Sequence, residues 1–252
     1  MSTPSAAILI IGNEILSGRT QEANVQFIAQ RLAARGIKLQ EVRVVPDVPA
    51  RIIAAVNELR AAYDLLFTTG GIGPTHDDIT SECIAAAFGV AWELHEETDR
   101  EMRAQMGERY NAARQRMATM PRGAVPIKNE ASVAPGFCMG NVYVMAGVPR
   151  IMQSMMQALE PLLPRGVAIK MQSVYGMGVL EGSIAEGLAA IQARFPQLEI
   201  GSYPFKRDAV WGVALVAKGT DHEAIAAATK EATSLIAGQG LTPVQGEPPE
   251  AA

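Results

Sequence analysis

The sequence predicts an α/β protein: a mostly parallel sheet with helices on both faces, followed by a small α+β domain. Strand-like and helical patterns alternate over the first half of the chain, an order that builds parallel sheets. One strand-like run ends in a loop with glycine at three of four positions, Gly70–Gly73. After Pro164-Arg165-Gly166 the order of the patterns changes, which indicates a domain boundary.

The first elements form a β-α-β-α-β series. Ala6–Ile11 is a continuous apolar run, typical of a strand that is covered on both faces. Apolar residues at helical spacing predict a helix over 21–35, and the alternating stretch Ile37–Val45 predicts a second strand. Another helical pattern over 49–62 leads to the third strand, Leu65–Thr69. The glycine loop follows that strand directly.

The remaining elements are more varied. The rest of the first domain is predicted as a helix, a charged helical stretch, a short strand, a β-hairpin and a helix, over 79–88, 96–118, 124–128, 137–145 and 150–163. The second domain is predicted as β-α-β-β-α, over 167–175, 181–194, 198–202, 210–217 and 221–237. The predicted domains are therefore an α/β domain over 1–166 and a small α+β domain over 167–240. The segment 241–252 contains several Pro and Gly residues and is expected to be a disordered tail.

The composition excludes several classes of protein. The 252 residues are 48% hydrophobic and 19% charged, which is enough apolar content for a sizeable core. A formal net charge of −4 argues against a nonspecific nucleic-acid binder, so no nucleic-acid partner is expected. No apolar window has the length of a membrane span, and Cys83 and Cys138 form no ligand cluster. The N-terminus also lacks a basic signal region. We therefore expect reduced thiols, no membrane partner and a cytoplasmic location.

The glycine loop carries the main functional prediction. A strand that breaks into a glycine loop at the start of a helix can place bare backbone N–H groups around a phosphate. Glycine is needed there because a side chain would forbid φ > 0 or block the phosphate. An ordinary tight turn is the alternative. The predicted ligand-binding residues of the loop are Gly70, Gly71, Ile72, Gly73, Pro74 and Thr75.

Acidic residues beside the loop predict a divalent cation. Asp77 and Asp78 exceed what the dipole of a first helical turn needs, and carboxylates commonly hold Mg²⁺ against a ligand phosphate. We therefore predict a Mg²⁺, Mn²⁺ or Co²⁺ site at Asp77 and Asp78. The loop lacks Lys-Ser/Thr after Gly73 and lacks G-x-G-x-x-G spacing, which disfavours P-loop ATP hydrolysis and nicotinamide binding.

Other polar residues are expected at the same edge of the sheet. The carboxyl ends of parallel strands meet at one edge, so Asn13, Glu14 and Asp47 should lie near the loop. Asn13 and Glu14 would contact the ligand or cap a helix, and Asn24 would be structural or face a ribose. One arginine of a charged helix face could pair with a diphosphate at this edge. The candidates are Arg103, Arg109, Arg114 and Arg116.

The segment Thr68–Thr80 resembles the signature of the molybdopterin-binding, or MoCF-biosynthesis, domain in its CinA-type branch. The likeness includes Gly12–Gly18 and Asn24. Further blocks follow in family order over 116–121, 134–137 and 147–149. The second half resembles, more loosely, the small KH-like middle domain of that branch. No counterpart of the branch's C-terminal amidohydrolase domain follows, so no deamidation of nicotinamide mononucleotide is expected.

The resemblance implies roles for three aspartates. Asp78 stands where the family has an aspartate of metal-dependent pyrophosphate chemistry, and Asp47 stands where it has a second site carboxylate. Both are therefore catalytic candidates. Asp77 matches the CinA-type branch, whereas the molybdopterin-adenylating branch has arginine there, which favours hydrolysis over adenylyl transfer. Arg150 stands where the family usually shows an acid before a methionine, so the resemblance supports no role for that turn.

The resemblance to CinA-type proteins implies a metal-dependent hydrolase of a nucleotide diphosphate, similar to an ADP-ribose pyrophosphatase. The metal would stabilise charge on the diphosphate while a metal-bound water attacks. Two alternatives remain: a molybdopterin-binding protein of molybdenum cofactor biosynthesis, and a noncatalytic nucleotide sensor. The expected ligand is a small nucleotide or a pterin. A homo-oligomer is also expected; the methionine-rich stretch 139–156 would form its interface or be buried within the monomer.

Overall fold

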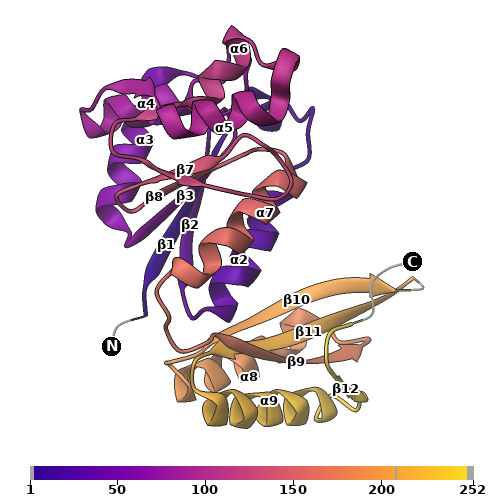
Figure 1. Cartoon of the computed structure of the whole chain (residues 1–252). Helices are drawn as coiled ribbons and strands as arrows, with labels where there is room; N and C mark the ends of the chain where they lie inside the picture. The colour runs from indigo at the N-terminus through magenta and orange to yellow at the C-terminus, as the bar shows by residue number, and fades with distance from the viewer. Residues whose placement is uncertain (1–2, 208, 249–252) are drawn as a thin grey trace. The chain divides into compact units, whose positions relative to one another are not determined.

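The computed structural model describes residues 3–207 and 209–248. The chain divides into two compact units, with the boundary between Gly166 and Val167 (Figure 1). Among the described residues, no helix combines the length and the apolar character that crossing a membrane requires.

The first unit is built on a six-stranded sheet in the order β2-β1-β3-β8-β7-β6 (Figure 1). Four strands are parallel neighbours: β2 (Lys38–Val45), β1 (Ser5–Ile11), β3 (Leu65–Thr69) and β8 (Val142–Met145). The next strand, β7 (Gly136–Met139), is antiparallel both to β8 and to the edge strand β6 (Val125–Ile127). The predicted α/β class with a mostly parallel sheet is therefore confirmed.

Helices cover both faces of this sheet, as the buried central strands require (Figure 1). Leu9 and Leu66 pack in the hydrophobic core under two helices, α3 (Pro49–Ala62) and α4 (Thr80–Phe88). Ile8 and Phe67 alternate with them and pack in the opposite core. That second core lies under α2 (Asn24–Ala34) and α7 (Pro149–Leu159). Phe67 is fully buried, so its truncation would cost about 3–5 kcal/mol of stability.

The charged stretch expected as one helix over 96–118 is divided into four short elements. These are α5 (Glu96–Met106), η1 (Gly107–Arg109), α6 (Ala112–Gln115) and η2 (Arg116–Ala118). The prediction of a single helix is wrong for a local reason: Gly107 has a φ of 54° and ends α5. A side-chain contact then holds the chain after Gly107 against α5: the buried carboxylate of Asp99 accepts hydrogen bonds from Arg103 and Tyr110. Helical spacing alone does not reveal that contact.

Short elements complete the first unit. A small antiparallel sheet, which no pattern in the sequence predicted, is formed by β4 (Trp92–Leu94) and β5 (Thr119–Pro121). The remaining elements are α1 (Asn13–Leu16) after β1 and η3 (Glu160–Leu162) after α7.

The second unit is a four-stranded antiparallel sheet with two helices, in the strand order β10-β11-β9-β12. Its strands are β9 (Lys170–Met177), β10 (Glu199–Arg207), β11 (Val210–Gly219) and β12 (Pro243–Gln245). Its helices are α8 (Glu181–Arg194) and α9 (His222–Ala237). Val174 and Leu215 of the sheet share a core with Ile184 and Ile225 of the helices.

The tail expected to be disordered contains a strand. β12 pairs with β9, and the Gln245 side chain donates a hydrogen bond of 2.9 Å to the Thr233 hydroxyl. The amide of Gly246 also donates to the carbonyl of Ser173 at 2.9 Å. The Pro and Gly content of this segment indicated disorder. Composition carries no information about the edge of β9, with which the segment pairs. Residues 249–252 of the expected tail lie outside the described residues.

Candidate functional site

The glycine loop lies at the carboxyl edge of the first sheet, where several strands end together. β3 runs directly into the loop, and the amide of Gly70 donates to the carbonyl of Met145 at the end of β8, at 3.2 Å. Gly12, just after β1, likewise donates to Val45 at the end of β2, at 3.2 Å. The expected convergence of the loops at this edge is therefore present in the fold.

The backbone of the loop requires glycine at two positions. Gly70 and Gly71 have φ values of 102° and 66°, which disfavour other residues. A Cβ on Gly70 would lie 2.0 Å from the carbonyl oxygen of Ile11, and a Cβ on Gly71 would lie 2.3 Å from the Thr80 hydroxyl oxygen. Both places are filled by neighbouring protein atoms, so the glycines first serve the close packing of the loop.

The start of α4 holds the carbonyl side of the loop and leaves its amides free. The hydroxyl and the amide of Thr80 donate to the carbonyls of Gly70 and Gly71, each at 2.9 Å. The amides of Gly71, Ile72 and Gly73 donate to no atom of the residues that the structure describes. Three successive unpaired N–H groups next to a helix N-terminus are suited to an anionic ligand.

Asp78 closes the loop from within. Its Oδ2 accepts hydrogen bonds from the amide of Thr75 at 2.8 Å and from the hydroxyl of the same residue at 2.5 Å. A Cβ on Gly73 would lie 2.6 Å from that Oδ2, so the carboxylate sits against the loop backbone. Asp78 therefore has a structural part in shaping residues 73–78.

Asp77 is the carboxylate of the loop that faces solvent. Its side chain is 64% exposed, and its Oδ1 lies 4.0 Å from Nδ1 of the fully exposed His76. The neighbouring Thr75 side chain, and after it the backbone amide of Asp77, lower the pKa of Asp77 below its usual range. Asp77 is thus an exposed anion at neutral pH.

The other predicted carboxylate, Asp47, ties two loops together. Its Oδ2 accepts a hydrogen bond of 2.8 Å from the amide of Asn13, the first residue of α1. Asn13 and Glu14 are exposed at this edge, where their side chains remain open to a ligand. A Cβ on Gly12 would lie 2.5 Å from the Glu14 carboxylate, so that carboxylate turns back toward the end of β1.

The acidic residues do not assemble a metal site of their own. Across residues 3–207 and 209–248, no group of three or more His, Cys, Asp or Glu side chains is placed to hold an ion. Asp78 and Asp47 each use a carboxylate oxygen to bind a loop amide. Within the described residues Asp77 and Asp78 therefore form no ion site by themselves, and a divalent cation held there together with a ligand phosphate stays a prediction.

Buried polar atoms without partners gather around the same loop. Among the described residues, three buried side-chain atoms lack a hydrogen-bond partner: Asn24 Oδ1, Thr68 Oγ1 and Arg116 Nε. Thr68 is the residue before the last of β3, and Arg116 reaches the loop through Asp78. Asn24 reaches it through Gly147. Such atoms are rare in native proteins and call for an explanation at each position.

Arg116 brings a fixed positive charge to the loop. Its Nη2 lies 3.4 Å from the carbonyl oxygen of Asp78, a long hydrogen bond. Its guanidinium carbon lies 5.2 Å from the centre of the Trp92 ring, which itself donates to Ser81 and Thr119 at 3.0 Å. The sequence analysis placed Arg116 among four candidates, and only the fold shows that this one borders the loop.

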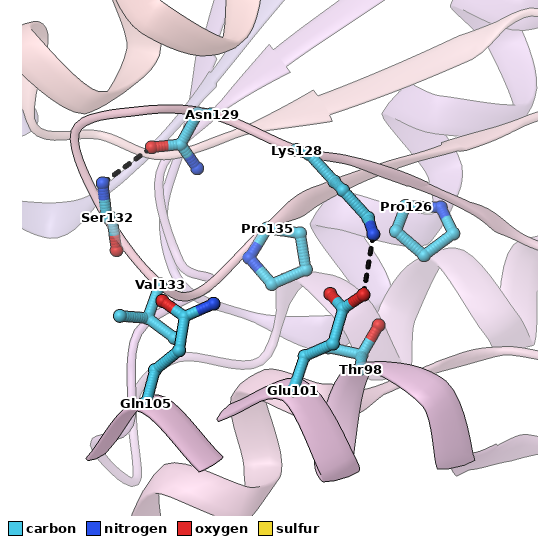
Figure 2. Close-up of a pocket in the computed structure, with 9 residues that line it drawn as sticks. All are labelled: Thr98, Glu101, Gln105, Pro126, Lys128, Asn129, Ser132, Val133 and Pro135. Atoms are coloured by element: carbon cyan, nitrogen blue, oxygen red, sulfur yellow. Dashed lines mark hydrogen bonds and ion pairs between the residues drawn. The ribbon is translucent and has the colours of Figure 1, made fainter. Parts of the chain in front are cut away.

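A small polar pocket of about 90 Å³ lies elsewhere in the first unit, between α5 and the segment 126–135 (Figure 2). Figure 2 shows Lys128 paired with Glu101 at 2.7 Å and Asn129 accepting from the amide of Ser132 at 2.7 Å. These groups are already paired with each other. The pocket contains none of the residues predicted from the glycine loop.

Comparisons with known proteins agree with the fold. Residues 7–165 match the family described as "Probable molybdopterin binding domain", and residues 173–245 match the family described as "FAD synthase, middle domain". A protein of Pyrobaculum calidifontis is 35% identical over 212 residues, which are 80% of this chain and 81% of that protein.

Two further similarities carry more informative names. A CinA-like protein of Desulfovibrio desulfuricans is 32% identical over 244 residues, 93% of this chain but 56% of that protein. The crystal structure of the protein CinA of unknown function from Thermoplasma acidophilum is 32% identical, with a TM-score of 0.60. That match covers 63% of this chain and 97% of the solved chain.

Proposed function

The chain belongs to the molybdopterin-binding domain family, and on that premise we propose that its first unit binds a phosphorylated pterin at the glycine loop. The observation that carries the proposal is the set of three unpaired amides, Gly71–Gly73, beside the guanidinium of Arg116. The pterin class comes from the family, and the phosphate from the geometry of the loop.

The loop is prepared for an anion by its backbone. Amide N–H groups that are held in place before binding need little reorganisation when an anion arrives. Thr80 holds two loop carbonyls and Asp78 holds the far end of the loop, so the free amides are fixed from both sides. Arg116 adds a positive charge. It offsets the exposed carboxylate of Asp77, whose repulsion is screened by solvent.

The proposed test compares two arginines of the same charged stretch. A pterin with a phosphorylated side chain serves as the probe, and its intrinsic fluorescence reports binding. Arg116→Met removes the guanidinium beside the loop and should weaken binding about 10- to 100-fold, the range for a hydrogen bond to a charged group. Arg114→Met makes the same change of charge, but the Arg114 side chain donates to the carbonyl of Arg109. Its affinity should stay at the wild-type value.

Either of two results would overturn the proposal. One is the absence of probe binding to the wild-type protein, with inorganic pyrophosphate also failing to bind. The other is an equal loss in both arginine variants, because that would reflect net charge and not the loop.

A second candidate function, hydrolysis of a nucleotide diphosphate such as ADP-ribose, rests on the exposed and ionised Asp77 beside the loop. A metal would have to arrive with the substrate, since the carboxylates form no ion site of their own among the described residues. Release of AMP from ADP-ribose with Mg²⁺, Mn²⁺ or Co²⁺ tests this candidate. Turnover that disappears in Asp77→Asn, with folding retained, would support it over binding alone.

A further inference from the structure

The side chain of Asn24 is buried with half of its hydrogen-bonding capacity unused. Only 6% of Asn24 is exposed. Its Nδ2 donates to the carbonyl oxygen of Gly147 at 2.9 Å, while its Oδ1 is buried and has no partner among the residues that the structure describes. A buried acceptor without a partner costs roughly 1–3 kcal/mol, so the position is expensive unless something else donates to it.

Capping of helix α2 does not account for Asn24. The helix starts at Asn24, and the carboxylate of Glu22 accepts from the amides of Asn24 and Val25, at 2.6 Å and 3.1 Å. The first two amides of the helix are therefore already satisfied by another side chain. The amide group of Asn24 is left for a contact with Gly147 on one side and for an unfilled contact on the other.

The backbone to which Asn24 donates lies next to the glycine loop. Gly147 packs so closely on the loop that a Cβ there would lie 3.3 Å from the Cα of Gly70. Asn24 thus reaches the loop from the face of the sheet that α2 covers. Arg116 reaches it beside α4, on the other face. The loop is flanked by an unpaired acceptor at one side and by an unpaired cationic donor at the other.

We propose that Oδ1 of Asn24 accepts a hydrogen bond from an N–H group of the heterocycle whose phosphate binds at the glycine loop. Asn24 is then a specificity-determining residue: it selects ligands that present a donor at this side of the loop. A pterin ring carries ring and exocyclic N–H groups and fits this requirement. The inference rests on the proposed function, because it needs the phosphate of the same ligand at the loop amides.

The loop amides and Asn24 should make separable contributions to binding. Inorganic pyrophosphate engages only the anion-binding part of the site, whereas the pterin with a phosphorylated side chain engages both parts. Asn24→Leu removes the acceptor within a similar volume and should weaken pterin binding about tenfold, the value of one buried hydrogen bond. Its affinity for pyrophosphate should remain that of the wild type.

Two more variants separate recognition from stability. Asn24→Asp keeps an acceptor oxygen but loses the donor to Gly147, so pterin binding should stay within about threefold of the wild type. Asn141→Ala removes an asparagine whose Nδ2 also ties distant carbonyls, those of Arg60 and Tyr63, at 3.0 Å and 3.1 Å. That variant should lose stability but keep both affinities.

The possible results distinguish a failure of this inference from a failure of the proposed function. If Asn24→Leu binds the pterin as tightly as the wild type, Asn24 is a packing residue and the inference is wrong, while the proposed function stands. An equal loss of pterin and pyrophosphate in Asn24→Leu would also reject it, because the defect would then lie in the loop. If Asn24→Leu does not fold, a tenfold loss of pterin affinity in Asn24→Asp would reject the role of the acceptor.

Discussion

The two ends of the six-stranded sheet treat polar groups in opposite ways. At the amino end of the central strands, Asp64 accepts from both the amide and the hydroxyl of Ser5, at 2.8 Å and 2.7 Å. Asn141, at the start of β8, donates to two backbone carbonyls there. At the carboxyl end, three amides of the glycine loop have no partner in the described part of the chain, and buried side-chain atoms that also lack one there border the loop.

The contrast separates stability from function within one sheet. Polar groups that satisfy one another hold the chain in place and leave nothing for a ligand. Unpaired polar groups cost stability and persist where a ligand satisfies them. Under the proposed function, the amino end of the central strands stabilises the sheet and the carboxyl end binds the ligand.

The sharpest way to break the contrast is an alanine at a glycine on each end. Gly70→Ala places a Cβ 2.0 Å from a backbone oxygen at a φ of 102°, so it should destabilise the protein by more than about 3 kcal/mol and abolish probe binding. Gly140→Ala, in the turn at the opposite end, has a φ of 58° but meets only the Phe88 side chain, at 3.2 Å. It should cost about 1 kcal/mol and leave binding intact. Urea unfolding and probe fluorescence measure both effects, and equal losses would show that the loop has no special geometry.

An effect of intermediate size is expected for Asn141, at the amino end of the central strands. Asn141→Ala removes the donor to the Arg60 and Tyr63 carbonyls and should lower the free energy of unfolding by about 1–3 kcal/mol. Denaturant midpoints at constant m-value would report the change. Loss of ligand affinity in this variant would argue that the two ends are coupled and not separate.

The smallest effect concerns the stability of the protein at acid pH and depends on Asp64, at the amino end of the central strands. Hydrogen bonds from Ser5, first from its hydroxyl and then from its amide, lower the pKa of Asp64 in the folded state. A lowered folded pKa contributes stability that is present above the unfolded pKa, about 3.9, and is lost as pH falls through the folded pKa. Asp64→Asn should therefore show a shallower loss of stability between about pH 4 and pH 2 than the wild type. Parallel curves for the two proteins would show that the Ser5 contact stores no such stability.

The sequence predicted the elements whose patterns are local. The continuous apolar runs of β1 and β3, the alternation of β2 and the glycine loop between β3 and α4 are all encoded by neighbours along the chain. Gly70 and Gly71 could be predicted because a positive φ and a close backbone approach both require glycine.

Contacts between distant residues could not be predicted in the same way. Asp78 was predicted as a metal ligand and Asp47 as a catalytic carboxylate; that each also binds a loop amide depends on how the loops close in space. Arg116 was one arginine among four until the return at Gly107 brought it to Asp78. β12 depends on an edge of β9 that lies over sixty residues away. Spacing in the sequence carries no signal for such pairings.

The most direct test of ligand binding at the glycine loop is the amide NMR spectrum of the protein during titration with the phosphorylated pterin. The amides of Gly71, Ile72 and Gly73 have no partner among the described residues, so they should shift most and gain protection from hydrogen exchange. The chemical shifts and exchange rates of the amides around Gly140 and Asn141, at the amino end of the central strands, should not change. Shifts confined to residues away from the loop, with Gly71–Gly73 unaffected at saturation, would contradict the account.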